Sequence, residues 1–273
     1  MKATVFLGGG RITSALIAGL RRAGYKTPIV VHDRNPGKLR TLRRQFGVTV
    51  EPDLRRAVAL ARLLIIAVRP GDVAAILEQV RLAPSLPSNK RRRHHALIAC
   101  SLAAGIPLAK LREKVGRPVC WARAMPSPVC RTGRGLTALI FERGFPRASR
   151  TLVREFFALV GTVLEIPESQ FDTFTVTFSP SHAYHALAAL AKVAQKLGLG
   201  RQVAFVAARH ALADAMISWE EGGESLEGLL HEAATPGGTA AAVMNAMDAA
   251  GHSQMIERSL LAGVARARKN AQG

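Results

Sequence analysis

A short apolar segment that runs into three consecutive glycines opens the chain, and this feature restricts the fold more than any other. Residues 4–7 have the composition of a buried strand, and a helical pattern begins a few residues later. Glycines at such a junction allow a tight turn and let a ligand approach the backbone, while the N-terminus of the following helix attracts phosphate. The pattern predicts a parallel α/β sheet that binds the diphosphate of a dinucleotide at Gly8, Gly10, Arg11 and Ile12.

The third position of this glycine pattern carries Thr13 instead of a small residue, which predicts slightly wider packing between helix and strand. An ordinary glycine-rich turn is the alternative interpretation. Asp33 lies 23 residues after Gly10, at the end of the next predicted strand, where an acidic residue commonly binds the ribose. This second signal favours a dinucleotide site, although a capped loop before the helix at Pro36 is compatible with the same residues.

Two adjacent side chains point to different coenzymes. Asp33 suits the free 2′-hydroxyl of NAD, whereas Arg34 suits the 2′-phosphate of NADP and can stack on the adenine ring. The first half of the chain is strongly basic, which favours NADP (NADPH), and NAD remains possible.

The net charge of +19 is distributed unevenly. Residues 1–160 contain 30 Lys and Arg against 8 Asp and Glu, and residues 161–273 contain 8 against 11. Aromatic residues make up 5% of the chain, so there is little material for stacking nucleic-acid bases. The basic run at residues 90–95 is expected to be a solvated loop. We therefore expect a small anionic ligand near the first half, and no nucleic-acid partner.

No segment suits a membrane span or a disulfide framework. The longest strongly apolar run, residues 63–68, has the length of a core strand, and the N-terminus reaches glycine too early for a signal peptide. The cysteines Cys100, Cys120 and Cys130 are odd in number and lack zinc-site spacing. These features predict a reduced, cytoplasmic location, no metal and no membrane partner.

The chain divides into two parts of different character. In residues 1–166, short apolar runs alternate with helical patterns over residues 12–23 and 36–46, which indicates a parallel sheet covered on both faces. The expected strands are residues 4–7, 29–31, 63–68, 96–99, 119–122, 136–141 and 160–164. Residues 167–273 are rich in alanine and predict helices over residues 183–197, 201–219, 226–233, 239–249 and 253–269. Stripes of small residues on these helices permit close packing, within one subunit or between two.

Several motifs in the same order resemble those of the pyrroline-5-carboxylate reductase family, over nearly the whole chain. The motifs are the Gly8 loop, Asp33-Arg34-Asn35-Pro36, Ala67-Val68-Arg69-Pro70, the segment 101–106, Arg123-Ala124-Met125-Pro126 and Pro236-Gly237-Gly238-Thr239. The resemblance implies an N-terminal Rossmann-type doubly wound parallel sheet followed by an all-α dimerisation domain. It further implies a homodimer or higher homo-oligomer that transfers hydride from NAD(P)H to the C=N carbon of a cyclic imine, converting 1-pyrroline-5-carboxylate to L-proline in proline biosynthesis.

The resemblance also assigns site residues. Those expected to bind the coenzyme are Gly8, Gly10, Arg11, Ile12, Asp33, Arg34, Ala67, Val68, Arg69, Pro70, Ala104 and Met125. Those expected to bind the substrate are Thr235, Gly238, Thr239 and Ala240, and Thr239 is also a catalytic candidate. His182, which departs from the family pattern, is the second catalytic candidate.

Three departures from the family pattern fall in the substrate half. Ser127-Pro128-Val129 replaces N-T-P, the segment 178–184 lacks both family glycines, and Ala240 replaces a threonine that the family uses near the imine and the carboxylate. Loss of one charge-assisted hydrogen bond costs about 1.5–3 kcal/mol, roughly a tenfold to hundredfold penalty. A reductase of a different imine, or a catalytically impaired descendant that still binds a dinucleotide, is therefore an alternative.

His182 stands where the family has proline, so a proton donor enters the predicted substrate site. Imidazole can donate a proton to an imine nitrogen near neutral pH. The alternative is a histidine near a helix N-terminus that is hydrated by water. Ser179 and Ser181 are expected to be ordinary N-caps of the same helix.

Overall fold

The structure is a computed structural model that describes residues 2–83, 97–116 and 118–272; the basic run at residues 90–95 lies outside them. By its internal contacts the chain forms two compact units, which are described separately. Unit 1 is Met1–Val176 with Gly263–Gly273, and unit 2 is Thr177–Ala262. Among the described helices, none has the length and apolarity needed to cross a membrane.

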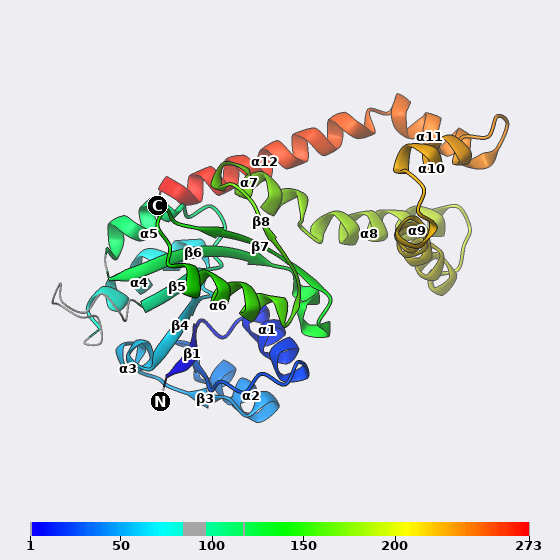
Figure 1. Cartoon of the computed structure of the whole chain (residues 1–273). Coiled ribbons are helices and arrows are strands. Elements are labelled where there is room, and N and C mark those ends of the chain that lie inside the picture. The colour runs from blue at the N-terminus through cyan, green and yellow to red at the C-terminus, as the bar shows by residue number, and fades with distance from the viewer. Residues whose placement is uncertain (1, 84–96, 117, 273) are drawn as a thin grey trace. The chain divides into compact units, whose positions relative to one another are not determined.

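Unit 1 is built on one eight-stranded sheet with the order β3-β2-β1-β4-β5-β6-β7-β8 (Figure 1). Every neighbouring pair is parallel except β6 and β7. The strands are β1 (Ala3–Leu7), β2 (Ile29–His32), β3 (Thr49–Val50), β4 (Ala61–Ile66), β5 (Leu97–Ser101), β6 (Val119–Pro126), β7 (Gly135–Phe141) and β8 (Gly161–Glu165).

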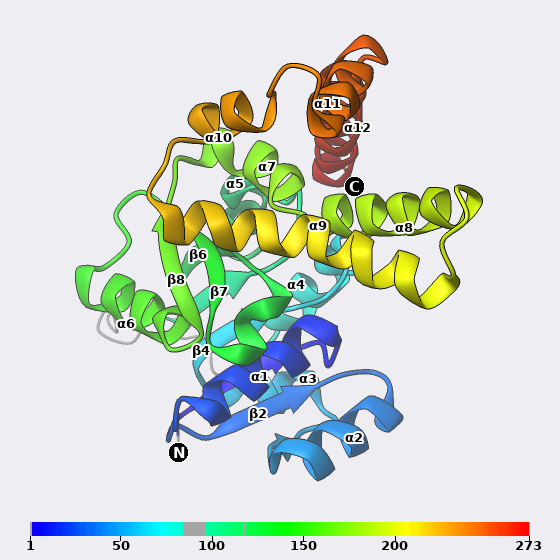
Figure 2. The same cartoon turned by 90° about the vertical axis from the view of Figure 1, so that its right-hand side faces the viewer.

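Helices cover both faces of this sheet, which confirms the doubly wound α/β prediction. Because side chains alternate along a strand, Phe6 packs on one face, while Val5 and Leu7 pack on the other. The first face is covered by α1 (Arg11–Arg22), α2 (Pro36–Phe46) and α6 (Arg147–Ala158), which can be followed in Figure 2. The second face is covered by α3 (Leu54–Ala59), α4 (Val73–Arg81), α5 (Leu108–Lys114) and α7 (Glu168–Thr177).

Local signals explain why α2 begins and ends where the sequence predicts. The Asn35 side chain accepts hydrogen bonds from the backbone N–H groups of Gly37 and Lys38, and Pro36 occupies the first helical position. Gly47 closes the helix with φ of 62°, a conformation that favours glycine.

The structure corrects several predicted strands. The strand expected at residues 63–68 spans Ala61–Ile66, and the chain bends at Val68 beside Gly8. The strand expected at residues 96–99 spans Leu97–Ser101, and residue 96 lies outside the described residues. β7 runs antiparallel to β6, contrary to an all-parallel sheet. The link between them, residues 127–134, contains only the short turn η3 (Pro128–Thr132) and is too short for a parallel crossover.

Unit 2 is entirely helical, as predicted. Its helices are α8 (Ser181–Lys196), α9 (Arg201–Gly222), α10 (Leu226–Ala233) and α11 (Thr239–Ala249), and α12 (His252–Gln272) begins in unit 2 and ends in unit 1. All of Thr177–Ala262 is described, and the side chains buried within it are those of Ala191, Ala204, Ala208 and Ala241. The side chains buried inside this unit are therefore all small, as the alanine stripes indicate.

Candidate functional site

The predicted coenzyme residues gather at one edge of the sheet of unit 1. Strands β2, β1, β4, β5 and β6 are parallel, so their carboxyl ends lie at the same edge. The strand order reverses between β1 and β4, and open α/β sheets bind ligands at such a point. Around it lie Gly8, Gly10, Arg11 and Ile12 after β1, Asp33 and Arg34 after β2, Ala67, Val68, Arg69 and Pro70 after β4, Ala104 after β5, and Met125 near the end of β6.

The glycines of the loop have different roles. Gly8 has φ of 107°, and a methyl group on it would lie 2.5 Å from the carbonyl oxygen of Ala67. Gly10 is the N-cap of α1 and receives no side-chain cap; apart from its chain neighbours, no heavy atom of the described residues would lie within 4 Å of a methyl group there. Gly8 therefore fixes the turn of the loop. Gly10, which has open space around it, leaves the N-terminus of α1 accessible, as binding of a dinucleotide diphosphate requires.

We expect Gly10→Ala to weaken NADPH binding by about tenfold or more, because the added methyl group occupies the space that the diphosphate requires. The free energy of unfolding should fall by less than about 1 kcal/mol. Gly8→Ala is the contrasting variant, because backbone strain and the Ala67 contact should destabilise the fold by about 1–3 kcal/mol or more. Coenzyme titration and urea unfolding measure both effects. Wild-type NADPH affinity in Gly10→Ala would contradict the assignment.

Thr13 secures the glycine loop from within α1. Its side chain is fully buried, and its hydroxyl donates a 2.6 Å hydrogen bond to the carbonyl oxygen of Gly8. The residue that departs from the glycine pattern thus fixes the turn through a polar contact. Sequence reasoning considered only its size and missed this bond.

Asp33 braces the loop from the end of β2. One carboxylate oxygen accepts a 2.7 Å hydrogen bond from the N–H of Gly9, and the other accepts a 2.8 Å bond from the N–H of Asn35. Burial by itself would raise the pKa of Asp33, but these two N–H donors and the nearby Lys38 outweigh it and hold the pKa below the usual 3.8. Each carboxylate oxygen keeps further acceptor capacity, which suits a ribose hydroxyl.

This lowered pKa predicts a pH dependence of stability. Since the pKa of Asp33 is lower in the folded protein than in the unfolded chain, its ionised form stabilises the fold above about pH 4, and this contribution is lost as the pH falls through the folded pKa. The difference in unfolding free energy between wild type and Asp33→Asn should be largest above about pH 5 and shrink towards about pH 2. Urea unfolding across this range measures it. If the difference in unfolding free energy between wild type and Asp33→Asn does not change with pH, the ionised Asp33 does not stabilise the glycine loop.

Arg34 extends beside Asp33 into solvent. Its guanidinium lies 2.8 Å from a carboxylate oxygen of Asp72, at the end of the turn η1 (Pro70–Asp72) that follows β4. Lys38 lies 3.5 Å from Asp33, and Arg69 is exposed on the neighbouring loop. Two cations therefore lie beside the end of β2, and each is paired with a carboxylate, Arg34 with Asp72 and Lys38 with Asp33.

The end of α12 packs against the loop that contains Ala104. The side-chain amide of Asn270 donates a 3.4 Å hydrogen bond to the carbonyl oxygen of Ala104. Gly105 has φ of 79°, and a methyl group on it would lie 2.2 Å from the carbonyl oxygen of Ala267. The last turns of the chain thus support the loop after β5. No sequence motif indicated this long-range contact.

Arg123 is a buried cation on β6, two residues before Met125 and on the same sheet face. Its side chain is 2% exposed. Its guanidinium nitrogens lie 3.1 Å from a carboxylate oxygen of Glu168 and 3.3 Å from a carboxylate oxygen of Asp172. Its guanidinium lies 4.4 Å from the ring centre of Phe171, and its Nε has no hydrogen-bond partner among the described residues. Arg123 therefore fastens α7 to the sheet next to Met125.

The predicted substrate and catalytic residues belong to unit 2. Thr235, Gly238, Thr239 and Ala240 surround the start of α11, where Gly238 is the N-cap and receives no side-chain cap. The N–H of Gly238 donates a 3.0 Å hydrogen bond to the carbonyl oxygen of Thr235. These residues thus come together at one helix N-terminus, which suits an anionic group. His182 is the second residue of α8, in a separate helix of the same unit.

The expected N-cap role of Ser179 and Ser181 is corrected. Pro180 occupies the N-cap position of α8, and no side chain caps this helix. The two serine hydroxyls instead lie 2.7 Å from each other, and that of Ser179 accepts a 3.4 Å hydrogen bond from the N–H of Ser181. Proline at position 180 places Ser181 inside the first turn of the helix.

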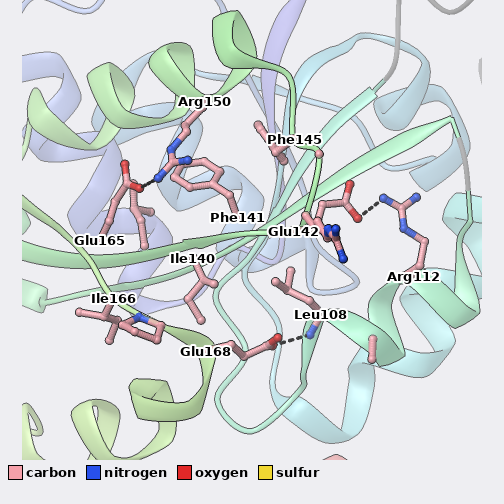
Figure 3. A pocket seen from close by; sticks show the side chains of 15 residues that line it. Leu108, Arg112, Ile140, Phe141, Glu142, Phe145, Arg150, Glu165, Ile166 and Glu168 are labelled. Atoms are coloured by element: carbon pink, nitrogen blue, oxygen red, sulfur yellow. Dashed lines mark hydrogen bonds and ion pairs between the residues drawn. The ribbon is translucent and has the colours of Figure 1, made fainter.

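A cavity of about 780 Å³ lies elsewhere in unit 1 (Figure 3). It is lined by the ends of β7 and β8, and because β7 is antiparallel to β6, these ends lie at the edge opposite the coenzyme site. Its charged side chains are largely engaged in ion pairs, namely Arg112 with Glu142 and Arg150 with Glu165, while Glu168 accepts a hydrogen bond from the N–H of Leu108. Because most of these charges already have partners, the size of the cavity is not sufficient to assign it as the reactive site.

The sheet, the glycine loop and the helical second part define a class: dinucleotide-binding oxidoreductases with a Rossmann-type domain followed by a helical domain. Family models match residues 4–90, described as NADP oxidoreductase coenzyme F420-dependent, and residues 168–270, described as pyrroline-5-carboxylate reductase dimerisation. The pyrroline-5-carboxylate reductase of Mycobacterium tuberculosis is 31% identical over 97% of this chain and 96% of its own. That of Thermus thermophilus is 33% identical over 89% of each. The chain belongs to the pyrroline-5-carboxylate reductase family.

Solved structures agree with this fold. The Plasmodium falciparum pyrroline carboxylate reductase with NADP bound has a TM-score of 0.85 at 17% identity, covering 99% of this chain and 98% of its own. The 1-pyrroline-5-carboxylate reductase from Streptococcus pyogenes has a TM-score of 0.85 at 21% identity, covering 98% of each. Together they confirm the predicted Rossmann-type sheet and helical second part. The matched dimerisation region indicates a homo-oligomer.

Proposed function

We propose that this protein reduces 1-pyrroline-5-carboxylate to L-proline with NADPH. The nicotinamide supplies the hydride, which adds to the C=N carbon, and a proton adds to the imine nitrogen, leaving L-proline and NADP⁺. As a member of its family, the chain is an NAD(P)H-dependent oxidoreductase. The observation that carries the proposal is the family relationship, which extends over nearly the whole chain. The preference for NADPH over NADH rests on the cations beside Asp33, Arg34 above all.

The position of each group at the sheet edge supports the coenzyme role proposed for it. Backbone N–H groups at Gly10, Arg11 and Ile12 would hold the diphosphate, because the first N–H groups of a helix lack intrahelical acceptors. Asp33 would accept a hydrogen bond from a hydroxyl of the adenine-side ribose, and Arg34 would bind the 2′-phosphate of the same ribose. The remaining residues would contact the nicotinamide half, namely Ala67, Val68, Arg69, Pro70, Ala104 and Met125.

The substrate role falls to the start of α11 and to α8. The uncapped N-terminus at Gly238, with Thr235 and the Thr239 hydroxyl, suits the substrate carboxylate. His182 would deliver the proton to the imine nitrogen. The methyl group of Ala240 cannot donate a hydrogen bond, so this site holds its substrate with one donor fewer than the family pattern.

The assembly we propose is a homodimer formed through unit 2, in the cytoplasm. Unit 2 buries only small side chains internally and leaves large apolar ones more than 40% exposed, including Leu190, Val193, Val203, Phe205, Met216 and Trp219. A second copy that covers these side chains would remove this apolar surface from water. The cysteines Cys100 and Cys130 are buried free thiols, which suits a reducing compartment.

The test incubates the purified protein with NADPH and 1-pyrroline-5-carboxylate, and with related cyclic imines in parallel. We expect loss of NADPH absorbance matched by an equal amount of L-proline, and a markedly lower rate in Gly10→Ala at limiting NADPH. Oxidation with a different imine alone would replace the substrate assignment. No oxidation with any imine would contradict the reductase function.

A further inference from the structure

Asp72 forms an ion pair that its position in the fold does not require. It lies where η1 joins α4, its backbone is already helical, and its side chain makes no capping hydrogen bond. Its carboxylate instead lies 2.8 Å from the guanidinium of Arg34, a residue 38 positions earlier that follows a different strand. The carboxylate of Asp72 has no capping role, and by pairing with Arg34 it acts on the part of the site where the ribose phosphate is expected.

Asp33 cannot contribute attraction for that phosphate. Both of its carboxylate oxygens accept backbone N–H groups, from Gly9 and Asn35, and its negative charge opposes an anionic ligand. Arg34 is thus the guanidinium best placed at the end of β2 to bind a 2′-phosphate, and part of its hydrogen-bonding capacity is already taken by Asp72.

We propose that Asp72 competes with the 2′-phosphate of NADPH for Arg34 and thereby lowers the preference of this site for NADPH over NADH; this rests on the coenzyme role proposed above. The pair is exposed, with side chains 79% and 36% accessible for Arg34 and Asp72. Such pairs are weak, so a phosphate carrying nearly two negative charges displaces the carboxylate. The displaced carboxylate remains nearby and repels the phosphate.

Removing this charge has a defined consequence. In Asp72→Asn, Arg34 is released and the repulsion disappears, so NADPH should bind about threefold to tenfold more tightly at low salt. NADH has no 2′-phosphate, so its affinity should change by less than about twofold. The gain for NADPH should decrease as salt is raised, because the interacting charges are exposed.

The experiment measures the dissociation constants of NADPH and NADH by calorimetry on the full chain at low and high salt. Glu78→Gln is the matched control, because it also removes one negative charge from an exposed ion pair, Glu78 with Arg81 at 2.6 Å, further along α4. It should alter neither affinity beyond about twofold. In an Arg34→Ala background, Asp72→Asn should increase the affinity for NADPH by less than in the wild type, because the guanidinium for which Asp72 and the phosphate compete is absent.

The outcomes separate this inference from the proposed function. Tighter NADPH binding in Asp72→Asn, with NADH unchanged, supports the competition. Weaker binding of both coenzymes overturns it, since Asp72 would then orient Arg34 against the adenine. An unchanged ratio of the two affinities also overturns it and leaves the reductase function intact. If the wild type binds neither coenzyme, the reductase function and this inference both fall.

Discussion

Replacing Arg123 with alanine is expected to lower the free energy of unfolding by about 3–5 kcal/mol. The guanidinium is almost fully buried between Glu168, Asp172 and the ring of Phe171. Its removal leaves two carboxylates without their cation and opens a cavity between β6 and α7. Urea unfolding followed by circular dichroism measures the loss.

Arg150→Ala is the control for this prediction. Arg150 also pairs with a carboxylate, Glu165, and stacks on an aromatic ring, that of Phe141, but its side chain is 52% exposed. Its loss should cost less than about 1 kcal/mol. Similar small losses in both variants would show that Arg123 does not fasten α7 to the sheet.

Ala240→Thr is expected to raise kcat/KM for 1-pyrroline-5-carboxylate by about tenfold to hundredfold. The family pattern has a threonine at this position, close to the imine and the carboxylate, and a charge-assisted hydrogen bond contributes about 1.5–3 kcal/mol. The position is the second residue of α11, next to Thr239 at the helix N-terminus. Initial rates of NADPH oxidation at low substrate concentration measure the change.

Ala242→Thr provides the matched control, because it makes the same chemical change at an exposed position of the same helix. It should leave kcat/KM within about twofold of the wild type. No gain in Ala240→Thr, with coenzyme binding intact, would indicate that this chain does not use the family's substrate geometry. A descendant that binds the dinucleotide without reducing this imine would then be the better interpretation.

The glycine loop and the strand pattern could be predicted because their causes are local. Gly8 occupies a backbone conformation that favours glycine, and the apolar run before it has the composition of a buried strand. Parallel strands bring their carboxyl ends to one edge, so the residues that follow β1, β2 and β4 lie at the same edge of the sheet. The helical second part was equally predictable from its alanine-rich patterns between glycines.

Other features had no local cause. The short helices α3 to α5 are stabilised by packing against the sheet, and the two-residue strand β3 by pairing with β2, so their sequences carry weak signals. The antiparallel direction of β7 depends on how η3 turns the chain. The contact of Asn270 with Ala104 joins residues 166 positions apart, and no pattern in either segment indicates it.

That a sheet with a glycine loop is followed by a helical half can be read from the amino-acid sequence alone, because turn geometry and hydrophobic periodicity act over a few residues. The roles of the charged residues become visible only in the folded protein. Asp33 braces the glycine loop, Asp72 engages Arg34, and Arg123 fastens α7, although composition presents all of them simply as charges. The physical reason is that the role of a charged side chain is set by its partners and burial, and folding brings those partners from distant parts of the chain.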